Sequence, residues 1–134
     1  MTPIALRLHP GQDLYAELER LVNSRKINAA CILTCVGSLT CAVLRFANQE
    51  KPETLLGHFE IVSLTGVLSN KGSHCHIAIA DEQGRTYGAH LMPGCKIYTT
   101  AEIVVGIIPH YRFDRTFDPD TGYPELEVKY CSQK

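Results

Sequence analysis

The chain has 134 residues, 45% of them hydrophobic and 20% charged, and its 13 basic and 14 acidic side chains give a formal charge of −1. Length and composition are those of one globular domain, so we expect a single domain over residues 1–134. The near-zero charge provides no surplus of positive groups for a nucleic-acid backbone. No apolar run approaches the roughly 18 residues of a membrane span, so no membrane association is expected.

The first residues and the cysteines indicate the compartment. Apolar and polar side chains alternate at the N-terminus, which lacks the continuous apolar core of a secretion signal. Three of the six cysteines lie in apolar segments, where a free thiol behaves as a small hydrophobic group. We therefore expect reduced cysteines and a cytoplasmic protein, with the nucleus as the alternative.

The first predicted elements are a strand and a helix. Residues 3–9 alternate apolar and polar side chains, as in a strand with one buried face, and Pro10-Gly11 ends it. Residues 12–26 place Leu14, Leu18, Leu21 and Val22 on one face of an amphipathic helix. This is the one strong helical pattern in the chain.

The rest of the chain has the pattern of short strands separated by turns. We predict strands at 29–36, 41–46, 54–68, 74–80, 85–91, 95–108 and 126–130. The fold class is therefore α+β, a mainly antiparallel sheet of about seven or eight strands with one main helix packed on it.

Three histidines fall on one predicted hairpin. His74 and His76 are two residues apart, so on a strand they share a face. Residues 82–84 end in glycine, the residue that a three-residue hairpin loop prefers at its last position. That loop places His90 opposite His76 and diagonal to His74, close enough for one metal ion. A two-residue loop would instead turn His90 to the other face.

Zinc is the preferred metal, because it accepts neutral imidazoles and tolerates three protein ligands with one open position. The ligand set leaves nickel, iron and copper open. Cys75 points to the opposite face of the strand and is not a candidate ligand. In the alternative interpretation, His74 and His76 are polar residues on a solvated sheet face.

Two carboxylates interrupt apolar strands. Glu60 lies in His-Phe-Glu-Ile and Glu102 in Ala-Glu-Ile-Val. Each is a catalytic candidate, as a general acid or base beside the metal. The favoured interpretation is a carboxylate on a solvated face or in an ion pair across an oligomer interface.

A linear series of short motifs resembles the plants-and-prokaryotes-conserved (PPC) domain. The series is Gly57-His-Phe-Glu-Ile, His74-Cys-His, Gly88-Ala-His-Leu and Thr100-Ala-Glu-Ile-Val. The resemblance implies an antiparallel sheet packed against helix, a homotrimer, and metal binding by His74, His76 and His90. It also implies a stand-alone member, because the basic Gly-Arg-Pro core of the AT-hook is absent from this sequence. Residues 57–61 correspond to a segment linked with protein partners, but His58 stands where that motif has arginine.

The leading hypothesis is a non-catalytic oligomeric binding or regulatory module for a protein partner or small ligand, with a zinc site. Its rival is a zinc-dependent enzyme, hydrolase- or lyase-like, in which the same histidines would hold a zinc ion that acidifies a bound water. A DNA-binding protein is the weakest of the three, given the charge and the missing AT-hook.

Overall fold

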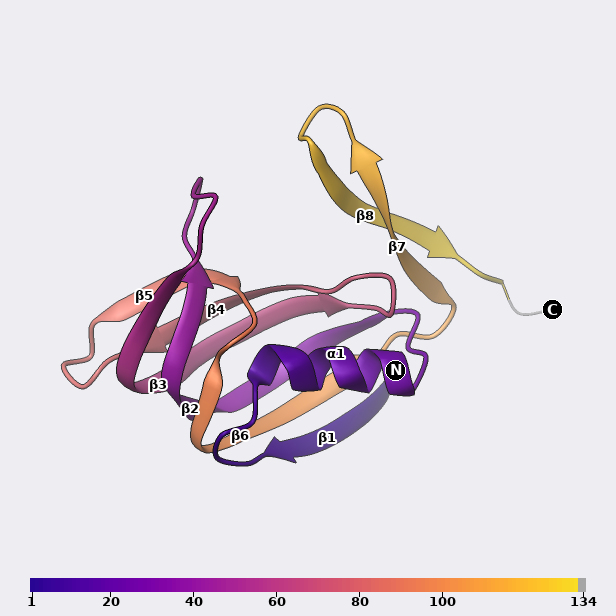
Figure 1. The fold of residues 1–134 in the computed structure, drawn as a ribbon. Helices are drawn as coiled ribbons and strands as arrows, with labels where there is room; N and C mark the ends of the chain where they lie inside the picture. Colours follow the sequence, from indigo (N-terminus) through magenta and orange to yellow (C-terminus); the bar gives the residue numbers. More distant parts are fainter. Residues whose placement is uncertain (133–134) are drawn as a thin grey trace.

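The computed structural model describes residues 1–132, which form one helix and eight strands in a six-stranded and a two-stranded antiparallel sheet. In chain order the elements are β1 (Thr2–Leu8), α1 (Leu14–Ser24), β2 (Ala30–Arg45), β3 (Glu53–Leu68), β4 (His74–Ala80), β5 (Thr86–Leu91), β6 (Lys96–Ile107), β7 (Tyr111–Asp118) and β8 (Tyr123–Tyr130) (Figure 1). The predicted α+β class is confirmed.

The six-stranded sheet curls so that part of it closes on itself. Its strand order is β1-β6-β2-β3-β4-β5, and the end of β2 also pairs with β5 through Leu44↔Leu91 and Arg45↔His90. Strands β2, β3, β4 and β5 thereby form a closed ring, named here the four-strand ring. Its interior is apolar, with Leu44, Ile77 and Ile79 at most 2% exposed.

Helix α1 lies across one face of the sheet (Figure 1) and buries Leu14, Leu18 and Val22, while Leu21, predicted on the same face, is partly buried. Asp13 caps its first turn by accepting a hydrogen bond from the backbone N–H of Ala16 at 3.2 Å. The same carboxylate accepts from the N–H of Gly94 at 2.8 Å, which ties the helix to the turn before β6. In the described residues no helix is long and apolar enough to cross a membrane.

The prediction of two separate strands at 29–36 and 41–46 is wrong, because β2 runs unbroken from Ala30 to Arg45. Gly37 does not end the strand. A Cβ at this position would lie 2.7 Å from the Cα of Ala101 and closer still to the carbonyl oxygen of Thr100. The glycine instead permits close approach to β6, where the pairing of the two strands is irregular.

The second sheet is a hairpin arm that the sequence patterns only half predicted. The final strand begins at Tyr123 rather than 126, and its partner β7 was not predicted. Figure 1 shows the arm, β7–β8, projecting from the six-stranded sheet. At its base, Phe113 donates from its backbone N–H to the carbonyl of Asn28 at 2.9 Å, and its carbonyl accepts from the Ser69 hydroxyl at 2.8 Å.

Candidate metal centre

The β4–β5 turn has the predicted three-residue loop. Gly84 adopts φ +79°, which suits glycine, and its N–H donates to the carbonyl of Asp81 at 2.9 Å. The Asp81 carboxylate accepts from the backbone N–H groups of Gln83 and Arg85, both at 2.9 Å, and from Arg85 Nε at 2.8 Å. Hydrogen bonds to the backbone and to the side chain of Asp81 thus both stabilise the three-residue loop.

This loop sets the predicted register, with His76 directly opposite His90. His74, one step along the face of β4, is the diagonal neighbour of His90. The ligand nitrogens of His74, His76 and His90 all lie within 4.8 Å of one another. The predicted convergence of the three imidazoles is confirmed, whereas metal binding by them stays a prediction.

The spacing of the rings suits a small metal ion. Nε2 of His74 lies 3.3 Å from Nδ1 of His90, while the His76 ring stands edge-on to both others at centroid distances of 4.8 and 4.6 Å. Zinc–nitrogen bonds of about 2 Å at tetrahedral angles place two ligand nitrogens about 3.3 Å apart. The His74 and His90 nitrogens thus already have the spacing of two zinc ligands, and the nitrogen of His76 lies within 4.8 Å of both.

The environment favours the neutral form of two of the imidazoles, which is the form that binds metals. Partial burial lowers the pKa of His74, and the neighbouring His76 and Arg115 lower it further, while Glu125 opposes them. Partial burial also lowers the pKa of His90, together with the positive charge of Arg45.

Cys75 lies on the opposite face of β4 from the histidines, as predicted. It is 9% exposed, and its Sγ occupies the space beside Gly66 on β3. Burial raises the pKa of its thiol to about 12. It is thus a protonated core residue and not part of the cluster.

The two carboxylate candidates lie on other parts of the sheet. Glu60 is exposed on β3 opposite Ser38, and Glu102 is exposed on β6 opposite Arg7, where it accepts a hydrogen bond from Thr100 at 3.3 Å. Neither lines the hollows that contain the histidines. A role for either as acid or base at this centre stays a prediction.

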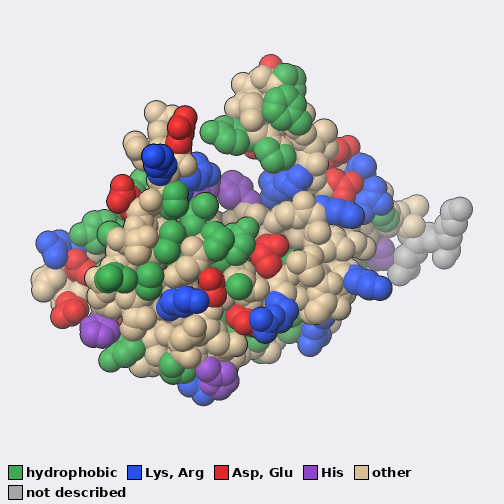
Figure 2. All heavy atoms as spheres, in the orientation of Figure 1, with side chains coloured by type: hydrophobic (Ala, Val, Ile, Leu, Met, Phe, Trp, Pro, Cys, Tyr) green, Lys and Arg blue, Asp and Glu red, His purple; other side chains and the backbone are tan. Residues whose placement is uncertain are grey.

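His74 and His90, but not His76, line a hollow of about 950 Å³ between the β2–β3 connection and the hairpin arm. Figure 2 shows histidine at the base of this hollow, with Lys and Arg side chains on both sides. The cations that line it are Arg45, Lys71 and Arg115. Sequence reasoning missed them, because they come from β2, the β3–β4 turn and β7 and meet only through long-range pairing.

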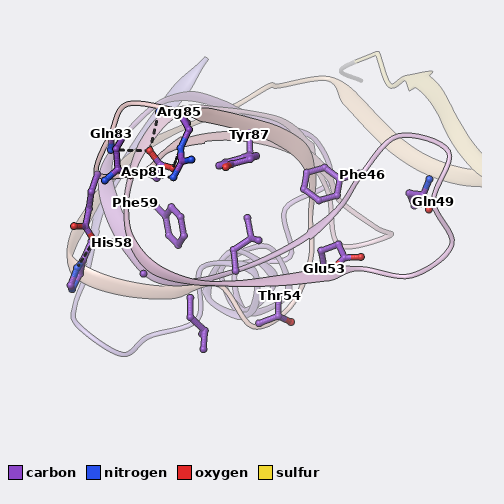
Figure 3. A pocket seen from close by; sticks show the side chains of 14 residues that line it. Phe46, Gln49, Glu53, Thr54, His58, Phe59, Asp81, Gln83, Arg85 and Tyr87 are labelled. Atoms are coloured by element: carbon purple, nitrogen blue, oxygen red, sulfur yellow. Dashed lines mark hydrogen bonds and ion pairs between the residues drawn. The ribbon is translucent and has the colours of Figure 1, made fainter.

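A second cavity, of about 800 Å³, opens at the end of the four-strand ring nearest the 81–85 turn. Figure 3 shows Phe46, Phe59 and Tyr87 pointing into it from three different strands or strand ends. His58 lies at its edge, with Nδ1 3.5 Å from a carboxylate oxygen of Glu82. The segment that the resemblance links with protein partners therefore borders this cavity and not the histidines.

Comparison with known proteins gives close relatives. Bifunctional protein GlmU of Synechococcus sp. (strain JA-3-3Ab) is 52% identical over 128 residues, which is 96% of this chain and 21% of the relative. The chain thus spans about a fifth of the length of the GlmU proteins it matches.

Two solved structures share the fold over nearly their whole length. A hypothetical protein from Salmonella cholerae-suis (Salmonella enterica) is 42% identical, with a TM-score of 0.94 and coverage of 96% of this chain and 94% of its own. A metal-containing protein from Archaeoglobus fulgidus is 27% identical, with a TM-score of 0.83 and coverage of 95% and 94%.

The family model described as the Plants and Prokaryotes Conserved (PCC) domain matches residues 1–109, which include every strand of the six-stranded sheet and all three histidines. This match confirms the resemblance inferred from the motifs. The chain belongs to the Plants and Prokaryotes Conserved domain family, abbreviated PPC above.

Proposed function

We propose that this protein is an oligomeric binding module whose β4–β5 hairpin carries a three-histidine site for a transition metal, with zinc preferred. The observation that carries the proposal is the convergence of His74, His76 and His90 within 4.8 Å on one sheet face. The similarity to the metal-containing protein of Archaeoglobus fulgidus adds support.

The donor set fits zinc chemically. Neutral imidazole is a preferred ligand of zinc, and three protein ligands leave a fourth position for water or another ligand. Imidazole also suits nickel, copper and iron, so metal identity is part of the test. Bound zinc would supply a Lewis acid, and the three histidines would hold it against the outer face of the four-strand ring.

Calorimetric titration of the metal-free full chain tests the site, together with elemental analysis of the purified protein. We expect one zinc per chain. His90→Ala should weaken zinc binding by more than about 100-fold, because loss of a ligand costs more affinity than loss of a residue that only hydrogen-bonds to a ligand. His58→Ala, a matched exposed histidine outside the cluster, should bind zinc normally. Equal zinc affinity in the two variants would contradict the proposal.

The second candidate is a zinc-dependent enzyme of hydrolase or lyase type, and the hollow beside the histidines favours it because substrate would have room there. Zinc acidifies a bound water to a pKa of about 7. The carboxylates that line this hollow are Glu50 and Glu125, not Glu60 or Glu102. Cobalt-substituted protein separates the two functions: a d–d spectrum that titrates near neutral pH indicates a bound water, and a pH-independent spectrum favours the non-catalytic module.

We also propose self-association as a homotrimer through the hairpin arm. Residues directly opposite each other on β7 and β8 share a face, and one face joins Phe113 with Val128 and Phe117 with Pro124, on either side of the Arg115–Leu126 pair. Phe117 is 64% and Val128 53% exposed. A two-stranded hairpin is marginally stable alone, so we expect another surface to cover this apolar face. We propose that a second copy of the chain provides that surface.

The sheet offers a second apolar surface of the kind that self-association would cover. Val36 on β2 is 62% exposed and Val62 on β3 is 57% exposed. Large side chains of this kind on a strand face often mark a protein–protein contact. In a homotrimer, Glu60 and Glu102 would lie near such a contact, in line with the favoured interpretation of these carboxylates.

A further inference from the structure

Three cations surround the histidine cluster, and their positions are set by the fold. Arg45 is the last residue of β2 and pairs directly with His90, which in turn faces His76. These three side chains therefore form one row on the outer face of the four-strand ring. Lys71 and Arg115 complete the lining from the β3–β4 turn and from β7.

Arg115 reaches the hollow because of a glycine. The stem of Arg115 lies against Gly72, where a Cβ would be 3.2 Å from the Cγ of the arginine. Gly72 has φ +133°, a conformation that side-chain-bearing residues rarely adopt. The turn before β4 thus leaves open the space through which Arg115 passes toward His74.

Nearby carboxylates only partly balance the charge of these cations. In the part of the chain that the structure describes, Arg45, Lys71 and Arg115 have no carboxylate within ion-pair distance, whereas Arg112 and Lys129 on the same arm both pair with Asp114. The side chain of Arg45 donates to the carbonyl of Gln49 at 3.3 Å.

The net positive charge of the hollow favours an anionic ligand. Two carboxylates, Glu50 and Glu125, also line the hollow, so its three cations leave it positive even with neutral histidines. A divalent metal on the histidines would add two more positive charges, and like charges this close repel each other. The arrangement becomes favourable when a negatively charged ligand lies among these groups.

We infer that the hollow binds an oxyanion, the carboxylate or phosphate of a small molecule, held by Arg45 and Arg115 beside the metal centre. The inference rests on the proposed metal site and names the ligand class of that site. The planar guanidinium group of arginine can donate two parallel hydrogen bonds to two oxygens of one carboxylate or phosphate. A hollow of about 950 Å³ has room for the organic part of the ligand, against Tyr123.

The test uses the full chain with two probes that share one ring, phenyl phosphate and benzoate. Binding is followed by calorimetry and by amide chemical shifts at fixed ionic strength, in zinc-loaded and metal-free protein, with zinc content measured on the same samples. We expect zinc-loaded protein to bind at least one probe, and the stronger probe distinguishes a phosphate from a carboxylate ligand.

Variants that each remove one positive charge show which arginines bind the probe. Arg45→Gln and Arg115→Gln should each weaken probe binding about 10-fold or more, the scale of one lost charged hydrogen bond, while zinc content stays at one per chain. Arg112→Gln, on the same arm but paired with Asp114, should change the affinity less than about twofold on the same scale. Arg45→Lys, which keeps the charge and the fold, should bind with intermediate affinity.

Two outcomes overturn the inference: zinc-loaded protein that binds neither probe, or arginine variants that bind as tightly as the parent chain. If the parent chain binds no zinc, the proposed metal site fails on its own. The metal-free titrations then decide: arginine-dependent binding of either probe supports the oxyanion site, and its absence overturns it.

Discussion

The pairing of β4 with β5 places all three histidines of the cluster. His76 and His90 face each other across the β4–β5 pair, and His74 reaches His90 diagonally. This register of β4 and β5 follows from local turn chemistry and could be predicted from Gly84. The surrounding cations could not, because Arg45 approaches His90 only through the closure of β2 onto β5.

The lowered pKa values of His74 and His90 predict a pH effect on the metal-free chain. Partial burial and nearby positive charge disfavour their protonated forms in the folded state. As pH falls below about 6.5, the unfolded chain therefore takes up protons before the folded chain does, and the stability decreases until the lowered native pKa values are reached. Urea unfolding at several pH values in the presence of a chelator measures this decrease.

The matched control for this effect is the double variant His74→Gln, His90→Gln. Its stability should depend less on pH between neutrality and mild acid, because the two shifted groups are gone. Parallel pH curves for the variant and the parent chain would show that other groups cause the effect.

At the scale of elements, the hairpin loop determines whether a site exists. Deleting Gln83 leaves a two-residue loop, which shifts the pairing by one and moves His90 to the other face. We expect the deletion variant to lose zinc binding in calorimetry. Gln83→Ala keeps the loop length and should bind zinc like the parent chain.

Amide spectra must show that the deletion variant is folded. A folded variant that retains full zinc affinity would mean that the register does not control the site, and the geometric argument would fail.

Strand β2 shows where sequence patterns mislead. A glycine after an apolar run usually indicates the end of a strand, yet Gly37 lies inside one, because its role is contact with Thr100 and Ala101 on a distant strand. Strand β7 was missed for a related reason. Its alternation is partly masked by charged residues such as Arg112 and Asp114, which pair with each other within the strand, while Asp114 also pairs with Lys129 across the arm.

The close approach at Gly37 predicts a stability effect. Gly37→Ala should lower the free energy of unfolding by about 1–3 kcal/mol, the usual cost of overpacking, because backbone atoms of β6 must move. Gly88→Ala is the control, since a Cβ there meets nothing closer than 3.7 Å. Chemical denaturation of both variants measures the difference, and equal stabilities would contradict the close-packing argument.

At the scale of the whole molecule, the exposed apolar face of the hairpin arm indicates that several copies of the chain associate. The apolar face of β7–β8 stays open in one copy, with Phe117 and Val128 more than half exposed. Light scattering of the full chain should give the mass of three copies. Phe117→Ser with Val128→Ser should lower that mass, whereas Glu127→Gln on the opposite face of the arm should not; a monomeric parent chain would contradict the proposal.

The histidine centre is the claim on which the proposed chemistry depends, and zinc K-edge X-ray absorption tests it most directly. For protein loaded with one equivalent of zinc, we predict three imidazole nitrogens at about 2.0 Å and one further light ligand. A spectrum with sulfur ligands, with fewer than three imidazoles, or unchanged by His76→Ala would contradict the account.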